Sequence, residues 1–239
     1  ISRGLVGSEM CIRDRHGALD YSDVLPMFQA MQSSGATLMA RVPWRDPGYI
    51  MKALDVGAMG IICPMINNSE EAAEFISYMR YPPLGQRSFG PTRVAVSVPD
   101  YGVEANDEVL AFAMIETADG VQNLEAIAAT AGLDGIYVGP ADLTLGTQLG
   151  RLAPGLDRTE DEMVTLIQKV ASVCKEYGLI AGIHCGTAEY ASKAIGWGYN
   201  LTTIGGDTRL LASAAAASVS SWRKLTGRKE KVQVTSGVY

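Results

Sequence analysis

Short apolar runs alternate with longer amphipathic stretches along most of this chain, and no other feature constrains the fold as strongly. The runs are rich in Ile, Val and Met and lack an apolar–polar alternation, which is typical of strands buried on both faces of a parallel sheet. Six runs are evident, at 37–44, 60–66, 111–117, 135–140, 179–186 and 201–206. The helical stretches lie at 22–33, 47–57, 69–79, 119–130, 159–177, 187–196 and 209–225.

This strand–helix repeat predicts an α/β fold, either a barrel or a doubly wound sheet. A closed TIM (β/α)8 barrel needs eight strands, and about six βα units are readable. The first two strands would have to precede residue 20, and segment 1–15 is polar, rich in arginine and too short to supply them. We therefore expect a barrel that lacks its first two strands, or a sheet that does not close.

Composition excludes several classes of protein. The 239 residues are 47% hydrophobic and 19% charged, which rules out a mainly disordered chain. The formal net charge of −6 argues against nucleic acid or an anionic membrane as the main partner. The apolar stretches are far shorter than the ~20 residues that span a bilayer. The four cysteines show no CxxC spacing, so we expect reduced thiols in a cytoplasmic protein.

Acidic side chains occupy the ends of two consecutive runs. Glu116 lies at the end of the run at 111–117, and Asp142 follows the run at 135–140. Neighbouring parallel strands bring both carboxylates to one rim, where α/β proteins place their sites. Such a pair suits a hard divalent ion, Mg²⁺ or Mn²⁺, with waters or substrate oxygens as further ligands. The alternative is that both acids only cap the helices that follow them.

Three other polar side chains stand at comparable positions. Arg41 lies in an apolar run and needs a partner, either a neighbouring acid or a substrate carboxylate or keto oxygen. His16 stands where the second strand of a barrel would end, although an ordinary loop histidine fits that position too. His184 also lies at a strand end, and the alternative for it is a hydrogen-bonded histidine of the core or rim.

Two connections between these elements have a composition that suits binding. Gly139, Pro140 and Ala141 form a tight strand-to-helix turn, which exposes backbone N–H groups and favours an anion. The irregular stretch at 80–106 is long enough to indicate a functional loop. Its Arg87 and Arg93 either bind an anion or are solvated.

Taken in order, several segments resemble the HpcH/HpaI class II aldolases. They are HG (16–17), RVPWRDP (41–47), LDVGAMGIICPM (54–65), RYPPLGQRSFG (80–90), AND (105–107), IET (115–117), GLDGIYVGPADL (132–143) and IGGDTRLL (204–211). The succession RYPPxGxRxxG, IET, GPADL is highly specific, and the resemblance extends to about residue 215. It implies a (β/α)8 barrel that carries out pyruvate enolate chemistry with a divalent ion, Mg²⁺, Mn²⁺ or Co²⁺.

The resemblance also implies roles for single residues. Glu116 and Asp142 match the two metal ligands of the family. Arg41 matches the arginine that binds the keto acid and stabilises its enolate, so we expect it to share substrate binding with the turn at 139–141. His16 matches the histidine that acts as a base through a water molecule.

The chain departs from the family directly before this histidine. The family pattern D-x-E-H reads RDRH at 13–16, and the glutamine two residues before the metal-binding glutamate is Met114. The string LVGSEMCIRDR resembles translated sequencing-adapter sequence. We therefore expect a non-native leader at 1–15, an N-terminally truncated aldolase barrel domain at 16–225 and a polar tail at 226–239.

The function implied is that of a metal-dependent class II aldolase, a carbon–carbon lyase that cleaves or forms 4-hydroxy-2-oxo acids, giving pyruvate and an aldehyde. A Schiff-base mechanism would need a lysine at a strand end, and the six runs contain none. One alternative is a citrate-lyase-like acyl-CoA lyase, which the net charge of −6 disfavours because CoA phosphates would need a basic rim. Another alternative is an inactive truncated fragment. The expected partners are a small 2-oxo acid, an aldehyde and further copies of the chain, since the family forms homo-oligomers, commonly hexamers.

Overall fold

The computed structural model describes residues 9–13 and 21–228. Seven strands form one sheet: β1 (Glu9–Arg13), β2 (Thr37–Arg41), β3 (Gly60–Cys63), β4 (Leu110–Ile115), β5 (Gly135–Val138), β6 (Ile180–Cys185) and β7 (Leu201–Ile204). The helices are α1 (Tyr21–Met31), the 3-10 helix η1 (Gln32–Ser34), α2 (Pro47–Asp55), α3 (Ser69–Met79), α4 (Val94–Ser97), α5 (Tyr101–Glu108), α6 (Ala118–Gln122), α7 (Leu124–Ala128), α8 (Pro140–Gln148), α9 (Asp161–Glu176), α10 (Ala188–Gly196) and α11 (Asp207–Leu225).

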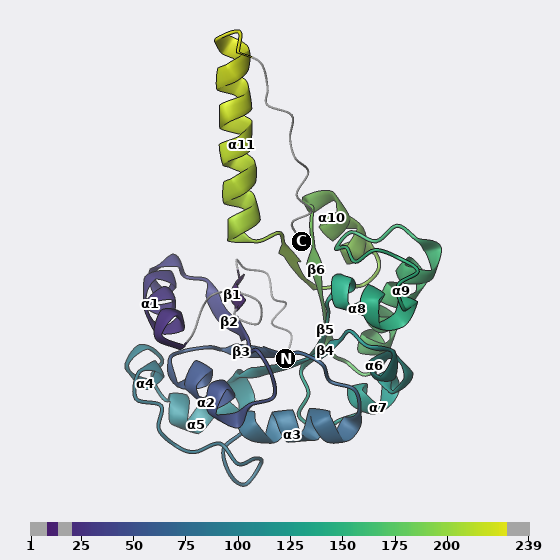
Figure 1. Ribbon diagram of the computed structural model, residues 1–239. Helices are drawn as coiled ribbons and strands as arrows, with labels where there is room; N and C mark the ends of the chain where they lie inside the picture. Colours follow the sequence, from purple (N-terminus) through teal and green to yellow (C-terminus); the bar gives the residue numbers. More distant parts are fainter. Residues whose placement is uncertain (1–8, 14–20, 229–239) are drawn as a thin grey trace.

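The strands follow one another in sequence order, and every neighbouring pair is parallel. The helical connections pack on the outer side of the sheet, which curls into an incomplete barrel (Figure 1). Parallel neighbours require such crossover connections, because the chain must return to the same end of the sheet before each new strand. The α/β barrel-type fold that the strand–helix repeat predicts is confirmed.

Segment 1–15 contributes one strand, although the sequence analysis expects it to be too short for the two missing strands. Strand β1 pairs with β2 from Glu9 opposite Thr37 to Arg13 opposite Arg41. The edge of β2 offers unpaired backbone groups, and a short extended segment satisfies them whatever its polarity. The described sheet therefore contains seven of the eight strands of a barrel.

The sheet separates two apolar clusters. The larger one fills the space between the strands and the outer helices. The smaller one lines the concave side and consists of Met39, Ile62, Phe112, Met114, Tyr137 and Leu201. Glycines on the inner face make room for these rings, since a Cβ at Gly182 would lie 2.6 Å from the ring of Tyr137. Alternate residues of β2 to β7 thus point to the helices and into the barrel.

The stretch at 80–106 is not irregular throughout, because it contains α4 and most of α5. Arg87 is buried there, and its guanidinium donates to the carboxylate of Asp55 at 2.7 Å and to the hydroxyl of Tyr101 at 3.0 Å. Arg93 donates to the backbone carbonyl that follows α2. Both arginines hold this connection onto α2, so neither expected role, anion ligand or solvated cation, describes them.

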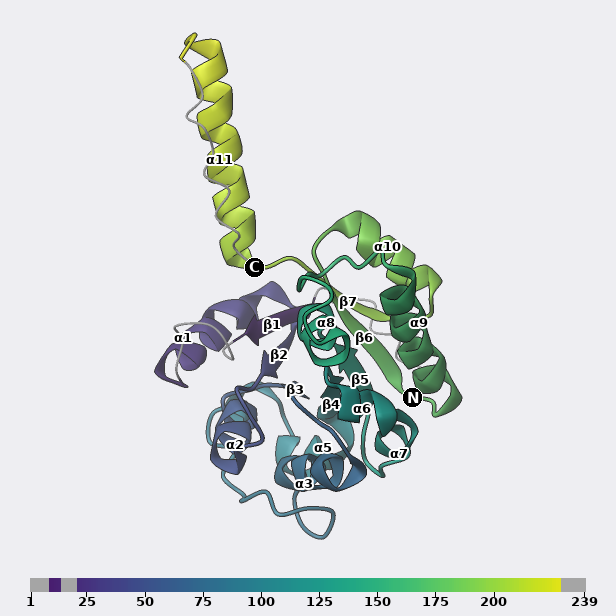
Figure 2. The ribbon, with the colours of Figure 1, turned by 45° about the vertical axis from the view of Figure 1, so that its right-hand side comes forward.

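Helix α11 extends away from the sheet in both views of the chain (Figures 1 and 2). Its large apolar side chains are exposed: Leu210, Leu211, Val219, Trp222 and Leu225. Neither α11 nor any other helix of residues 21–228 is both long and apolar enough to cross a membrane.

Candidate active site at the carboxyl ends of the strands

The carboxylate of Glu116 is the most deeply buried acid of this rim. Glu116 directly follows β4 and is 1% exposed. Its Oε1 accepts a hydrogen bond from the backbone N–H of Met65, with an N–O distance of 2.9 Å. Met65 lies after β3 and has a φ of 57°, in the left-handed region that residues other than glycine rarely adopt. Backbone conformations of this kind cluster at functional sites.

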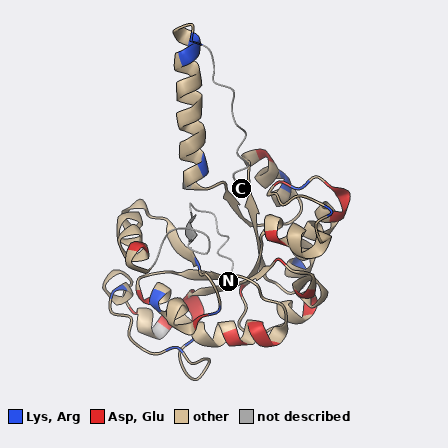
Figure 3. Ribbon diagram, in the orientation of Figure 1, with Lys and Arg blue, Asp and Glu red and all other residues tan. Residues whose placement is uncertain are grey.

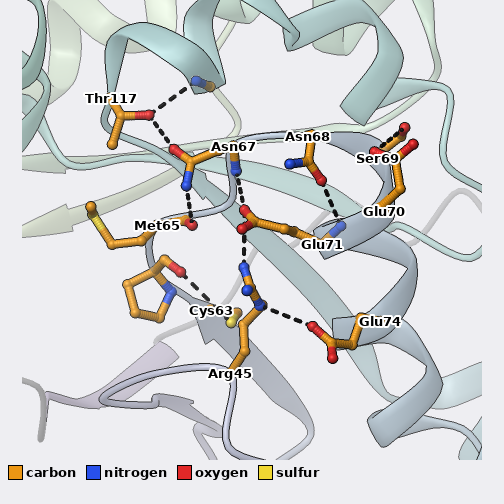
Figure 4. Close-up of polar contacts among 12 residues, drawn as sticks. Arg45, Cys63, Met65, Asn67, Asn68, Ser69, Glu70, Glu71, Glu74 and Thr117 are labelled. Atoms are coloured by element: carbon orange, nitrogen blue, oxygen red, sulfur yellow. Dashed lines mark hydrogen bonds and ion pairs between the residues drawn. The ribbon is translucent and has the colours of Figure 1, made fainter.

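A network of polar contacts holds the Met65 peptide in place (Figure 4). The hydroxyl of Thr117 donates to the side-chain oxygen of Asn67, whose amide group donates to the carbonyl of Met65 at 3.0 Å. The carboxylate of Glu71 accepts from the backbone N–H of Asn67 at 2.7 Å and pairs with Arg45 at 2.9 Å. Side chains from three connections of the barrel therefore hold the segment that carries the donating N–H of Met65.

Asp142 lies in the first turn of α8, and two glycines allow this helix to approach Glu116. A Cβ at Gly139 would lie 3.0 Å from Oε2 of Glu116, and a Cβ at Gly146 would lie 2.8 Å from its backbone oxygen. Asp142 and Gly146 are four residues apart and share one face of the helix. That face is turned toward Glu116, so the half-buried Asp142 stands at the same rim.

Arg41 and the start of α8 complete the described part of this rim. Arg41 ends β2, two residues after Met39 of the inner cluster, so its side chain also points to the concave side. Gly139 is the N-cap of α8 and makes no side-chain capping hydrogen bond, and Pro140 has no N–H. The first donor of the helix is therefore the N–H of Ala141, at a position that favours an anion.

His184 is buried on the inner face of β6, with 5% of its surface exposed. Its Nδ1 lies 2.6 Å from the hydroxyl of Thr203 on β7, which lies 2.5 Å from the hydroxyl of Tyr137 on β5. The sequence-based alternative of a hydrogen-bonded histidine is confirmed. His16, with Asp14 and Arg15, lies outside the described residues.

The donor set of this rim fits a hard divalent ion. Within residues 9–13 and 21–228, no three or more His, Cys, Asp and Glu side chains form a group that could hold a metal. A closed zinc site with four protein ligands is therefore absent from this part of the chain. Two carboxylates such as Glu116 and Asp142 match Mg²⁺ or Mn²⁺, which keep several waters and accept substrate oxygens.

Three residues that shape this site do not stand out in the sequence. Gly146 lies inside α8, and an isolated glycine in a helix can indicate that another part of the chain packs closely against it. Met65 follows a proline, but nothing in that pair predicts a left-handed conformation. Thr203 is an ordinary strand residue, and only the register opposite His184 reveals its contact.

Comparison with known proteins gives a consistent result. Residues 15–214 match the family model of HpcH/HpaI aldolase/citrate lyase. The chain is 37% identical over 212 residues to a hydroxypyruvate/pyruvate aldolase of Rhizorhabdus wittichii, covering 88% of this chain and 83% of that protein. It is 31% identical over 225 residues to a 5-keto-4-deoxy-D-glucarate aldolase of Klebsiella pneumoniae, covering 92% and 86%. A crystal structure of a family protein from Burkholderia cenocepacia has a TM-score of 0.80 at 31% identity, covering 89% and 84%.

Proposed function

The chain belongs to the HpcH/HpaI aldolase/citrate lyase family, and from that membership we propose that it is a metal-dependent aldolase acting on 4-hydroxy-2-oxo acids. The products of cleavage are a 2-oxo acid of the pyruvate type and an aldehyde. The observation that carries the proposal is the pair of acids at one rim, where Gly139 and Gly146 bring the helix of Asp142 against the buried Glu116.

Glu116 and Asp142 would hold a divalent ion, Mg²⁺, Mn²⁺ or Co²⁺. Two protein carboxylates leave most positions of an octahedral ion to waters and to the oxygens of a 2-oxo acid. When bound, such an ion supplies a Lewis acid that polarises the keto group. The hydrogen bond from Met65 orients the carboxylate of Glu116 for this role.

The substrate is bound by groups that face the same space. Arg41 offers a planar guanidinium on the concave side, which suits a keto oxygen and the negative charge that develops on it as the enolate forms. The N–H of Ala141 at the start of α8 suits the substrate carboxylate. Together these donors hold the 2-oxo acid portion while its bond to the aldehyde portion breaks.

Cleavage requires one base. The hydroxyl at carbon 4 loses its proton, the bond between carbons 3 and 4 breaks, and its electron pair passes into the enolate of the 2-oxo acid. Protonation of this enolate at carbon 3 completes the product. We assign the first proton transfer to His16, acting through a water molecule. His16 lies outside the described residues, so this assignment rests on the family motif.

A lyase for acyl-CoA thioesters would use the same acids, but two observations favour the aldolase. The relatives that are 37% and 31% identical are both aldolases. The phosphates of CoA would need a basic rim, and the net charge is −6. Lys and Arg are scattered among the acidic residues instead of gathering on one element of the described chain (Figure 3).

We also propose that the chain forms a homo-oligomer in the cytoplasm. The exposed apolar side chains of α11 support an association between copies. The described cysteines, Cys63, Cys174 and Cys185, form no disulfide with one another, which suits a reducing compartment.

The test is pyruvate release from a 4-hydroxy-2-oxo acid before and after treatment with EDTA. We expect activity to disappear with EDTA and to return with added Mg²⁺ or Mn²⁺. Full activity in EDTA would contradict the metal-dependent mechanism, and inhibition by CoA thioesters would favour the acyl-CoA lyase. A chain that neither turns over substrate nor melts cooperatively would be the inactive fragment.

A further inference from the structure

We propose that Asn67 is a positioning residue for the metal site, which holds the donor to Glu116 in place and thereby controls the affinity for the divalent ion. This inference rests on the proposed function, because it takes Glu116 to be a ligand of that ion. It assigns a role to a side chain outside the acid pair, on the connection between β3 and α3.

Hydrogen bonds join the side chain of Asn67 to both sides of Glu116. Its Nδ2 donates to the carbonyl of Met65 at 3.0 Å, and its Oδ1 accepts from the hydroxyl of Thr117 (Figure 4). The N–H of Met65 donates to Oε1 of Glu116, and Thr117 directly follows Glu116 in the chain. The Asn67 side chain therefore links the donor of this carboxylate to the backbone beside it, and the contacts form a closed ring.

The backbone of Asn67 is itself held by two neighbouring elements. Its N–H donates to the carboxylate of Glu71 in α3 at 2.7 Å. Its carbonyl accepts from the side-chain amide of Asn123, which lies between α6 and α7, at 2.8 Å. The amide group that reaches Met65 thus starts from a fixed point of the chain.

Met65 needs this restraint because its backbone conformation is unfavourable by itself. Its φ is 57°, which glycine adopts readily and other residues rarely do. Such a conformation persists only when the surrounding structure holds it. Without the amide of Asn67, we expect Met65 to relax toward negative φ and its N–H to lose its alignment with Glu116.

The consequence for the proposed site is a change in metal affinity. A ligand that is already oriented needs less reorganisation when an ion binds. Polar groups that orient metal ligands contribute roughly 10–100-fold to affinity. Loss of the Asn67 amide should therefore weaken binding of the ion more than it slows the chemistry at saturating metal.

The first test compares two neighbouring asparagines. We expect Asn67→Ala to raise the dissociation constant of Mn²⁺, measured by calorimetry, by about tenfold or more. Asn68→Ala is the matched control, because Asn68 caps α3 by accepting from the N–H of Glu71 at 2.8 Å. Both substitutions should lower the urea midpoint of the metal-free chain, but Asn68→Ala should leave the dissociation constant unchanged. Pyruvate release by Asn67→Ala should recover when Mn²⁺ is saturating.

Two further variants separate positioning from a general loss of structure. Asn67→Asp keeps the size of the side chain and the acceptor for Thr117, but it cannot donate to the carbonyl of Met65. We expect weaker Mn²⁺ binding, although the added negative charge alone would strengthen it. Met65→Gly should make the chain less dependent on Asn67, so the loss caused by Asn67→Ala should be smaller in that background.

The outcomes distinguish this inference from the function on which it rests. Equal dissociation constants in Asn67→Ala and Asn68→Ala, in a chain whose wild type binds Mn²⁺, overturn the role of Asn67 alone. Tighter binding by Asn67→Asp, or the same loss with Met65 and with glycine at that position, also overturns it. A wild type that neither binds Mn²⁺ nor releases pyruvate overturns the proposed function.

Discussion

The backbone N–H of Met65 donates a 2.9 Å hydrogen bond to Oε1 of Glu116, although the two residues are 51 positions apart in the chain. This bond joins the connection after β3 to the end of β4. It fixes one oxygen of the carboxylate through protein groups alone. In the proposed metal site Glu116 would be the preorganised member of the acid pair, because a ligand that is already oriented needs less reorganisation when an ion binds.

The Asp142→Ala variant distinguishes two possible roles of Asp142, that of a metal ligand and that of a helix cap. We expect Asp142→Ala to lower the affinity for Mn²⁺ by more than about tenfold and to abolish metal-dependent pyruvate formation, because the proposed site loses one of its two carboxylates. A capping role alone would cost about 0.5–2 kcal/mol of stability and spare the chemistry. Asp161→Ala, an acid in the first turn of α9, is the control. Calorimetry with Mn²⁺ measures the affinity, and unchanged affinity in Asp142→Ala would remove this residue from the site.

The close approach of α8 to Glu116 is tested by a pair of glycine substitutions. Alanine in place of a helical glycine ordinarily stabilises by roughly 0.5–1 kcal/mol. We expect that gain for Gly196→Ala in α10, where nothing lies within 4 Å of the added Cβ. Gly146→Ala should instead destabilise by about 1–3 kcal/mol, since its Cβ meets the backbone of Glu116 at 2.8 Å.

Gly146→Ala should also weaken Mn²⁺ binding, because α8 carries Asp142 away from Glu116 when it moves. Urea unfolding and Mn²⁺ titration of both variants provide the measurements. If the two variants gain the same stability, α8 does not press on the strand end as described.

In the stretch at 80–106, the buried Arg87 should contribute far more to the free energy of unfolding than the half-buried Arg93. Arg87→Met leaves the partly exposed carboxylate of Asp55 without its ion pair and removes a cation stacked 4.5 Å from the ring centroid of Tyr81. We expect a loss of about 2–4 kcal/mol in the free energy of unfolding. Arg93→Met, in the same loop, should cost less than about 1 kcal/mol. Equal losses in urea unfolding would contradict the structural role of Arg87.

Stability should fall in alkaline solution. Burial raises the pKa of the thiols of Cys174 and Cys185 from 9.0 to about 12, and the pKa of the Tyr190 hydroxyl from 10.0 to about 12. The negative charge of Asp157 adds to the shift at Cys185. Between pH 9 and 12 the folded chain therefore keeps protons that the unfolded chain has released.

The free energy of unfolding should thus decrease with rising pH, by at most roughly 1.4 kcal/mol per pH unit for each group. The stabilisation is complete below about pH 8.5 and is lost as the pH approaches the folded values. Urea midpoints at intervals from pH 8 to 11 measure the slope, and Cys174→Ala should make it shallower. A flat profile over this range would show that these groups titrate normally in the folded chain.

Much of the fold was predictable because it depends on local pattern. Strands β2 to β6 are mostly buried on both faces, and each apolar run is bounded by turn residues. By contrast, β1 depends on the free edge of β2, a partner that its own composition does not reveal. The role of Arg87 in the stretch at 80–106 was not predictable for a similar reason. Its hydrogen-bond partner Asp55 lies 32 residues earlier in the chain.

The site was predictable only in part. Glu116, Asp142 and Arg41 stand at strand ends, and strand ends can be located from the sequence. The hydrogen bond from Met65 and the contact of His184 with Thr203 depend on register and backbone conformation, which no single segment encodes. His16 lies outside the described residues, and its role stays a prediction.

The glycines at 139 and 146 also limit how this enzyme can change over generations. Every single-base change that replaces glycine by another amino acid adds a Cβ atom, and at both positions that atom would contact Glu116 at 3.0 Å or less. No single-base change that replaces either glycine is therefore neutral, whereas a substitution at the exposed Leu84 meets no such contact with Glu116. A directed-evolution library that seeks a new aldehyde range should keep both codons constant and place its diversity elsewhere on the rim.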